Sequence, residues 1–103
     1  MYRVRITYGH PTDPEAFDSY YANTHVPIAS RVPGVRQFFA GRCESFDGSE
    51  PDAYYVAELV FASREDAHAG FASPEGQAAA ADLANFATGG AAMMLANDDF
   101  TPI

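Results

Sequence analysis

The chain opens with strict alternation of apolar and polar residues over seven positions, YRVRITY. A period of two predicts a half-buried strand over Tyr2–Tyr8, with Arg3 and Arg5 on its polar face. The turn residues GHPTDP follow, and Asp13 before Pro14 is typical of an N-cap followed by the first helical residue. A helix is therefore predicted to begin at Pro14.

Apolar residues then recur at helical spacing as far as Val32. At about 100° per residue, one continuous stripe is predicted for a single helix over Pro14–Val32. Its members are Phe17, Tyr21, Thr24, Ile28 and Val32, with Tyr20 and His25 at the borders. The helix is expected to end at Val-Pro-Gly, because Pro33 disfavours helical backbone at Val32 and Gly34 turns freely.

Three further strands are predicted from apolar runs bounded by turn residues. They cover Val35–Phe46, with Gly41 as a candidate bulge, Ala53–Ala62 and Ala91–Phe100. Between the last two, Ser63 is typical of a helix N-cap, and Ser73 with Pro74 is typical of a second helix start. The alanine-rich run that follows, to position 87, predicts a helix of small residues that can lie close against a sheet.

The resulting order, β-α-β-β-α-β in a single domain over residues 1–103, predicts an α+β, ferredoxin-like fold. Its antiparallel sheet of four strands would carry both helical regions on one face. The third strand has apolar residues for both faces of that sheet. They are Tyr54, Val56 and Val60 on one face and Tyr55, Leu59 and Phe61 on the other. Apolar residues on an uncovered face predict a homodimer in which two sheets pack face to face.

The negative net charge of the chain limits the kinds of molecule that it is expected to bind. Six Lys and Arg residues, all of them Arg, against 14 Asp and Glu residues give a formal net charge of −8. This balance argues against nucleic-acid binding and against adhesion to anionic membranes, because both need cations. The single cysteine, Cys43, rules out an internal disulfide. No segment has the length of a membrane span or the pattern of a signal peptide, so we expect a cytoplasmic protein.

His25 is the main candidate for chemistry, because imidazole can accept and donate protons near neutral pH. Tyr21 precedes it by one helical turn and could share a hydrogen bond with it. Pro27 has no N–H group, so the carbonyl of Asn23 loses its helical partner, and a kink there would reorient His25. The alternative interpretation is a partly buried histidine that shapes the helix end by bonding a backbone carbonyl.

Aromatic residues predict a pocket beside this histidine. The side chains expected to bind a ligand are Tyr8, Phe17, Tyr20, Ile28 and Tyr54. The alternative is that they only pack the core or a dimer interface. Arg5 and Glu58 would lie on neighbouring strands and could pair. Motifs for zinc, nucleotides or phosphate are absent from the sequence, so neither a metal nor a cofactor is expected.

Two segments carry a family resemblance. The first is PEAFDSYYANTHVPIASRVPGVRQF, and the second is FASREDAHAGFASPEGQAAAADL. In the first, an aromatic at Phe17, the tyrosine pair, His25, Pro27 and the turn after Val32 fall in place. The chain therefore resembles the EthD-like family, part of the ferredoxin-like dimeric α/β barrel proteins.

The resemblance implies a dimeric α/β barrel and a histidine acid or base at the position of His25. The family takes its name from an accessory protein of ether degradation. Its relatives include cofactor-independent dehydratases, cyclases, isomerases and monooxygenases. Where the family often has Trp, this chain has Tyr21, which predicts a differently shaped pocket. Two functions are thus expected: an enzyme acting on a hydrophobic oxygenated molecule, or a non-catalytic accessory or ligand-binding protein of an oxygenase pathway.

Overall fold

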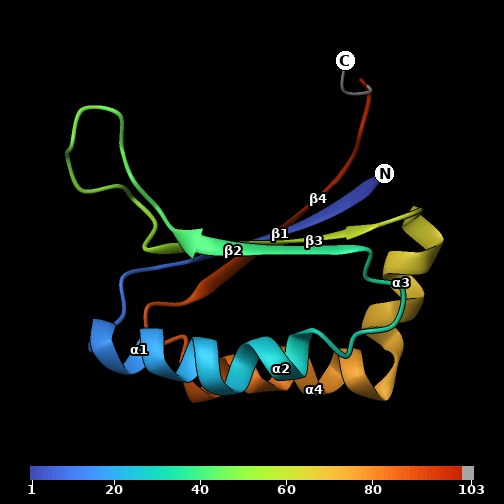
Figure 1. Cartoon of the computed structure of the whole chain (residues 1–103), viewed down its shortest axis with the longest axis horizontal. Coiled ribbons are helices and arrows are strands. Elements are labelled where there is room, and N and C mark those ends of the chain that lie inside the picture. The colour runs from blue at the N-terminus through green and yellow to red at the C-terminus, as the bar shows by residue number, and fades with distance from the viewer. Residues whose placement is uncertain (101–103) are drawn as a thin grey trace.

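The strand predicted from the opening alternation, β1 (Tyr2–Tyr8), lies inside a sheet of four antiparallel strands. The computed structural model describes residues 1–100 and places the strands in the order β2-β3-β1-β4. The other strands are β2 (Gln37–Arg42), β3 (Tyr55–Phe61) and β4 (Ala91–Asn97). All helices lie along one face of this sheet (Figure 1). The ferredoxin-like α+β fold is confirmed, although each of the three later strands is shorter than predicted.

The first helical region begins as predicted and then changes its pitch. α1 (Pro14–Tyr20) has Asp13 as its N-cap, with the Asp13 carboxylate 3.2 Å from the amide nitrogen of Ala16. A π-helical segment, η1 (Tyr21–His25), follows and leads into α2 (Val26–Ala29). In η1 the Val26 N–H donates to the carbonyl of Tyr21, five residues earlier. The single regular helix over Pro14–Val32 was therefore a wrong prediction.

The π turn changes which residues face the sheet. Because its hydrogen bonds span five residues, side chains spaced by four stay on the same side. Tyr21, His25 and Ala29 are buried as a result, whereas Thr24 is exposed and Ile28 is half-buried. The predicted stripe was wrong at Thr24 and only partly right at Ile28, which packs half-buried against the core, since it assumed the α-helical period throughout.

The second helical region confirms the predicted break. α3 (Arg64–Ala72) is capped by Ser63, and α4 (Pro74–Asp82) is capped by Ser73, whose hydroxyl accepts from the Gly76 N–H at 3.0 Å. A short 3₁₀ turn, η2 (Leu83–Asn85), continues α4. Gly76 permits the sharp junction, because a Cβ there would lie 2.2 Å from the carbonyl oxygen of Gly70.

Strand register confirms one predicted pair and corrects two other expectations. Arg5 lies opposite Glu58, and their side chains form an ion pair at 2.9 Å. The ladder between β2 and β3 continues unbroken through Gly41, so the bulge predicted there was wrong. β3 begins only at Tyr55, and the ring of Tyr54 packs against Phe17 on the helical side rather than on the open face.

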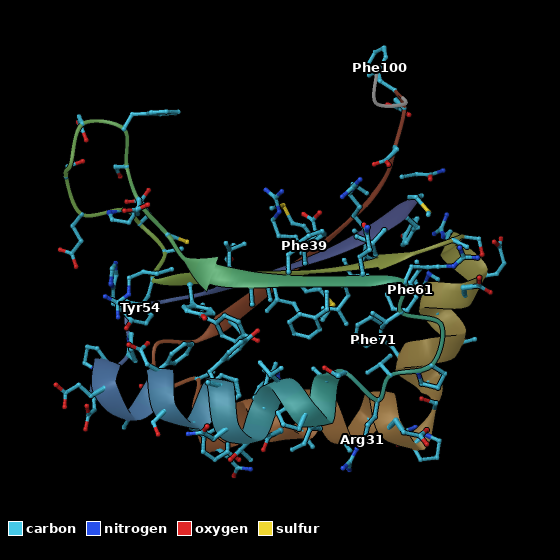
Figure 2. All side chains as sticks on the ribbon, viewed as in Figure 1. Arg31, Phe39, Tyr54, Phe61, Phe71 and Phe100 are labelled. Atoms are coloured by element: carbon cyan, nitrogen blue, oxygen red, sulfur yellow. The ribbon has the colours of Figure 1, made fainter. Side chains whose placement is uncertain are left out.

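The sheet face away from the helices is uncovered in the monomer. Phe39 projects from it, on the side opposite to the buried Phe61 and the half-buried Phe71 (Figure 2). Phe39 is 54% exposed and Met94 is 62% exposed. Glu58 and Arg5 lie between them in register, and the guanidinium of Arg3 bridges the carboxylates of Glu58 and Asp98, at 2.8 and 2.9 Å. This face therefore combines exposed apolar side chains with paired charges.

Within residues 1–100, none of the helices has the length and apolar character needed to cross a lipid bilayer.

Candidate functional site

A cluster of aromatic rings fills the space between the first helical region and the sheet. The rings of Tyr8 and Phe17 lie edge to face at 5.5 Å, and those of Phe17 and Tyr21 stack at 5.7 Å. Phe86, just after η2, closes the cluster and lies 4.6 Å from the imidazole of His25. Such contacts fix the orientation of each ring beyond what burial alone would do. They hold His25 within an apolar surrounding.

His25 pairs with a buried carboxylate from the other end of the chain. Its Nδ1 lies 2.9 Å from Oδ2 of Asp82, and the two residues are 3% and 6% exposed. The second oxygen of Asp82 accepts hydrogen bonds from the Tyr20 hydroxyl at 2.6 Å and from the Asn85 side-chain amide at 2.9 Å. Three donors from three elements therefore hold this carboxylate.

The hydrogen bonds decide the charge of Asp82 and the tautomer of His25. Burial alone would raise the pKa of Asp82, but bonds from Tyr20, Asn85 and His25 outweigh it and hold the pKa below its ordinary value. Asp82 is therefore a carboxylate at neutral pH and accepts the proton of Nδ1–H. In a neutral imidazole this leaves Nε2 as an unprotonated acceptor.

A small cavity of about 30 Å³ lies beside this pair, between the helices and the sheet. Its walls are almost entirely apolar, and its polar atoms come from Tyr8, Tyr21 and His25. The lining residues are Ile6, Tyr8, Tyr21, His25, Ala29, Phe38, Ala57, Leu59, Phe71, Ala79, Ala80, Leu83 and Met93. This volume is enough for about one water molecule.

Two buried hydroxyl groups belong to residues of the cavity wall. The side-chain oxygens of Tyr8 and Tyr21 are inaccessible and make no hydrogen bond of ordinary geometry with residues 1–100. Burial raises the pKa of Tyr8 to about 12, and burial together with the nearby Tyr8 raises the pKa of Tyr21 further. Both phenols keep their protons at neutral pH. The two phenols lie next to each other, and neither makes a well-formed hydrogen bond, so at least one of them is a donor that a ligand oxygen could satisfy.

The other residues expected at the pocket lie around this cavity rather than in its wall. Phe17 packs behind Tyr8 and Tyr21, and Tyr20 donates to Asp82. Ile28 packs half-buried against the core. The hydroxyl of Tyr54 donates to Asp18 at 2.7 Å, at the far end of α1. Of the predicted ligand-binding residues, Tyr8 alone joins Tyr21 and His25 in the cavity wall.

Sequence reasoning missed Asp82 entirely. It stands 57 positions from His25, and the alanine-rich helix around it suggested only close packing. One signal was present: Ala79, Asp82 and Phe86 recur at helical spacing, which places one carboxylate on the apolar face of that helix. A lone acid on such a face requires a buried partner.

The described residues 1–100 contain no group of three or more His, Cys, Asp or Glu side chains placed to hold a metal ion.

Comparison with known proteins places these features in context. The EthD domain family matches residues 9–90. An uncharacterized 11.0 kDa protein from the thcB-thcC intergenic region of Rhodococcus erythropolis is 52% identical over 99 residues, which is 96% of either chain. An ethyl tert-butyl ether degradation (EthD) family protein from Bacillus halodurans is 28% identical, with a TM-score of 0.89 over 95% of this chain and 98% of that one.

A more distant structure shares the fold. SnoaB from Streptomyces nogalater, a cofactor-independent oxygenase, is 23% identical and superposes with a TM-score of 0.65, covering 97% of this chain and 93% of that one.

Proposed function

This chain belongs to the EthD domain family, and from that premise we propose that it binds a small, apolar, oxygen-bearing molecule between its helices and its sheet. His25 would move a proton on that molecule. One observation carries the proposal: the imidazole, fixed by the buried Asp82, lines the same cavity as Tyr8 and Tyr21, whose hydroxyls make no hydrogen bond of ordinary geometry within residues 1–100. SnoaB, with the same fold, works without a cofactor, which supports the proposal by analogy alone.

The polar groups of His25, Tyr8 and Tyr21 are of the types needed to remove a proton from the carbon next to a carbonyl group. Nε2 of His25 would take the proton as the C–H bond breaks, and the electron pair would move onto the carbonyl oxygen to form an enolate. Tyr8 and Tyr21 would donate hydrogen bonds to that oxygen as its charge develops. Asp82 would stabilise the imidazolium formed, since its carboxylate already bonds Nδ1.

The size of the cavity sets a condition on binding. About 30 Å³ holds one water, so a larger ligand must displace side chains from the wall. Phe71 is half-buried and Met93 is 48% exposed, and both are wall residues with space on their outer side. We expect these two side chains to move when the ligand enters.

We also propose that two copies associate through the open face of the sheet. A hollow of about 340 Å³ on that face is lined partly by Arg5, Phe39 and Glu58. Large exposed apolar side chains on a flat sheet surface are typical of an interface. The paired charges beside them would remain satisfied under a second sheet.

Acetophenone offers a direct test, because its methyl protons lie next to a carbonyl and its ring is apolar. In D₂O, followed by ¹H NMR, the native protein is expected to accelerate exchange of those protons. His25→Gln is expected to lower the rate by about 10²-fold or more, the usual contribution of a general base. Tyr21→Phe is expected to lower it while leaving urea unfolding unchanged or slightly more favourable to the folded state, since the hydroxyl has no partner.

His10→Gln is the matched control, because His10 bonds the carbonyl of Pro51 far from the cavity. Binding of acetophenone without exchange would assign the protein to the non-catalytic, ligand-binding class. Equal exchange by the native protein and His25→Gln would overturn the proposed role of the imidazole.

A further inference from the structure

Two apolar hollows meet at Phe71 and Met93. One is the cavity beside His25, and the other is a groove of about 190 Å³ between α3 and β4. Phe71 and Met93 belong to the walls of both. The groove is lined by Tyr2, Val4, Ala67, His68, Phe71, Met93 and Leu95. These two side chains are therefore the partition between the cavity and the groove.

The groove is an extension of the same apolar surface. On the helical side of the sheet, Met93 pairs with Ile6 and Leu95 pairs with Val4, so the row continues along β4 from the cavity outward. The helices leave the end of this row uncovered, and Met93 and Leu95 are each 48% exposed. His68 is the one ionisable side chain in the groove wall besides the phenol of Tyr2.

We infer that the groove holds the apolar tail of the same molecule whose oxygenated head lies at His25. This inference rests on the proposed function and names its substrate class: a neutral amphiphile with a carbonyl-bearing head and a chain of several carbon atoms. Phe71 and Met93 part to let the chain pass. Closeness to the cavity argues for a ligand tail, because the shared wall residues Phe71 and Met93 are what separates the two hollows.

The chemistry of the wall supports a neutral chain. Ala67 is small, which leaves room on the α3 side, and Leu95 forms the opposite edge. Described residues of the groove include neither an arginine nor a carboxylate, so a charged tail would find no partner. Burying each additional methylene group should tighten binding by about fourfold.

A series of ketones tests the length dependence. Binding of acetophenone and its 4-ethyl, 4-butyl and 4-hexyl derivatives would be measured by calorimetry. The native protein should gain about fourfold in affinity per methylene, whereas Leu95→Gln should lose most of that gain and still bind acetophenone normally. Phe46→Gln is the control, since Phe46 is a fully exposed side chain in the loop between β2 and β3.

Methionine methyl signals in NMR give a second readout. The long-chain ketone should shift the Met93 methyl and leave that of Met94 unchanged, because Met94 lies on the opposite face of the strand. An equal chain-length gain in native protein and Leu95→Gln would overturn the inference. So would altered self-association of Leu95→Gln in ultracentrifugation, which would make the groove an interface between copies.

The two proposals fail in different ways. If His25→Gln keeps full exchange activity while Leu95→Gln loses the increase in affinity with chain length, the groove is supported as the tail site and His25 is excluded as the base. If His25→Gln loses exchange activity but Leu95→Gln keeps the increase in affinity with chain length, His25 is supported as the base and the groove is excluded as the tail site. If none of the ketones binds, both are overturned.

Discussion

Asp82 is the residue that would turn the buried His25 into a directed base in the proposed reaction. Its carboxylate accepts from Tyr20, from Asn85 and from Nδ1 of His25, so the ring is held in one orientation with Nε2 free. A histidine bonded to a backbone carbonyl, the structural alternative from the sequence, would have no charge to stabilise its protonated form. The ion partner therefore favours chemistry over a purely structural role.

Acid should destabilise the protein partly through Asp82. Its pKa in the fold lies below 3.8, the ordinary value, so the unfolded chain takes up the proton first as the pH falls. The contribution of Asp82 to the free energy of unfolding is thus complete above about pH 5 and is lost as the pH falls through the pKa of the folded state. Asp82→Asn should show a smaller loss of stability between about pH 5 and pH 3 in urea unfolding.

The exposed Glu75, in the first turn of α4, supplies the control for this measurement. Glu75→Gln should lose stability over that range as the native protein does. Equal acid sensitivity of native protein and Asp82→Asn would contradict the assigned linkage.

At this scale the sequence was enough to select His25 and Tyr21 as candidates, and the structure places both in one cavity wall. A histidine close to a proline inside a helix is visible within one short segment. The sequence could not pair His25 with Asp82, because that contact depends on how α4 docks, a tertiary event between distant parts of the chain. Similarly, Phe71 and Met93 line the cavity only because α3 and β4 pack where they do. Neither side chain is of a type that would mark it as a binding residue in the sequence.

Among the elements, the π-helical segment η1 is the one that orients the side chains of Tyr21 and His25. Pro27 cannot donate to a helical carbonyl, and the widened turn over Tyr21–His25 precedes it directly. The widened turn keeps Tyr21, His25 and Ala29 on the same buried side, whereas the α-helical period placed Thr24 in the stripe and His25 only at its border. π turns of this kind are frequent at functional sites.

Replacing the proline should therefore affect the site more than the fold. Pro27→Ala restores an N–H group, so the carbonyl of Asn23 can again accept and the segment can relax toward α-helix. We expect the ¹⁵N signals of His25 to move toward a tautomer mixture and ketone exchange to fall about tenfold, while the thermal transition is retained. Pro14→Ala, at the first position of α1, is the control and should change neither signal nor rate. Unaltered His25 signals in Pro27→Ala would refute the link between the proline and the site.

Helix starts and strand order were predictable because each has a local cause. Asp13, Ser63 and Ser73 cap helices in the structure as their sequence context indicates. The π turn could not be predicted by projecting the sequence at 100° per residue, because that projection assumes the α-helical hydrogen-bond pattern along the whole helix. Tyr54 was assigned to the wrong face for a related reason: alternation applies only inside a strand, and β3 begins one residue later.

The whole molecule has one covered and one bare sheet surface. The helices bury the aromatic core on one side, and Phe39 stands exposed on the other (Figures 1 and 2). Met94, opposite Arg5 in the register of β1 and β4, is also exposed. A sheet of this kind is stable alone only at the cost of leaving apolar surface in water. The proposed pairing of two copies would remove that surface.

A charge at the centre of the bare face should prevent association. Phe39→Glu would place one carboxylate from each copy in the interface without a cationic partner, since Arg3 and Arg5 already pair with Glu58. Sedimentation should show a dimer for the native protein and a monomer for this variant at micromolar concentration. Gln77→Glu, on the exposed side of α4, should remain dimeric. A native protein that sediments as a monomer would exclude the interface.

The span between His25 and Asp82 has a consequence for how the protein matures. During synthesis the imidazole leaves the ribosome long before α4 does, and a nascent chain that ends before Asp82 holds the ring without its carboxylate. The tautomer that frees Nε2 then has no support, and the cavity lacks the wall that Ala79 and Leu83 provide. Ketone exchange would therefore switch on only when the last helix docks, so that it reports completed folding and not merely the presence of the N-terminal half.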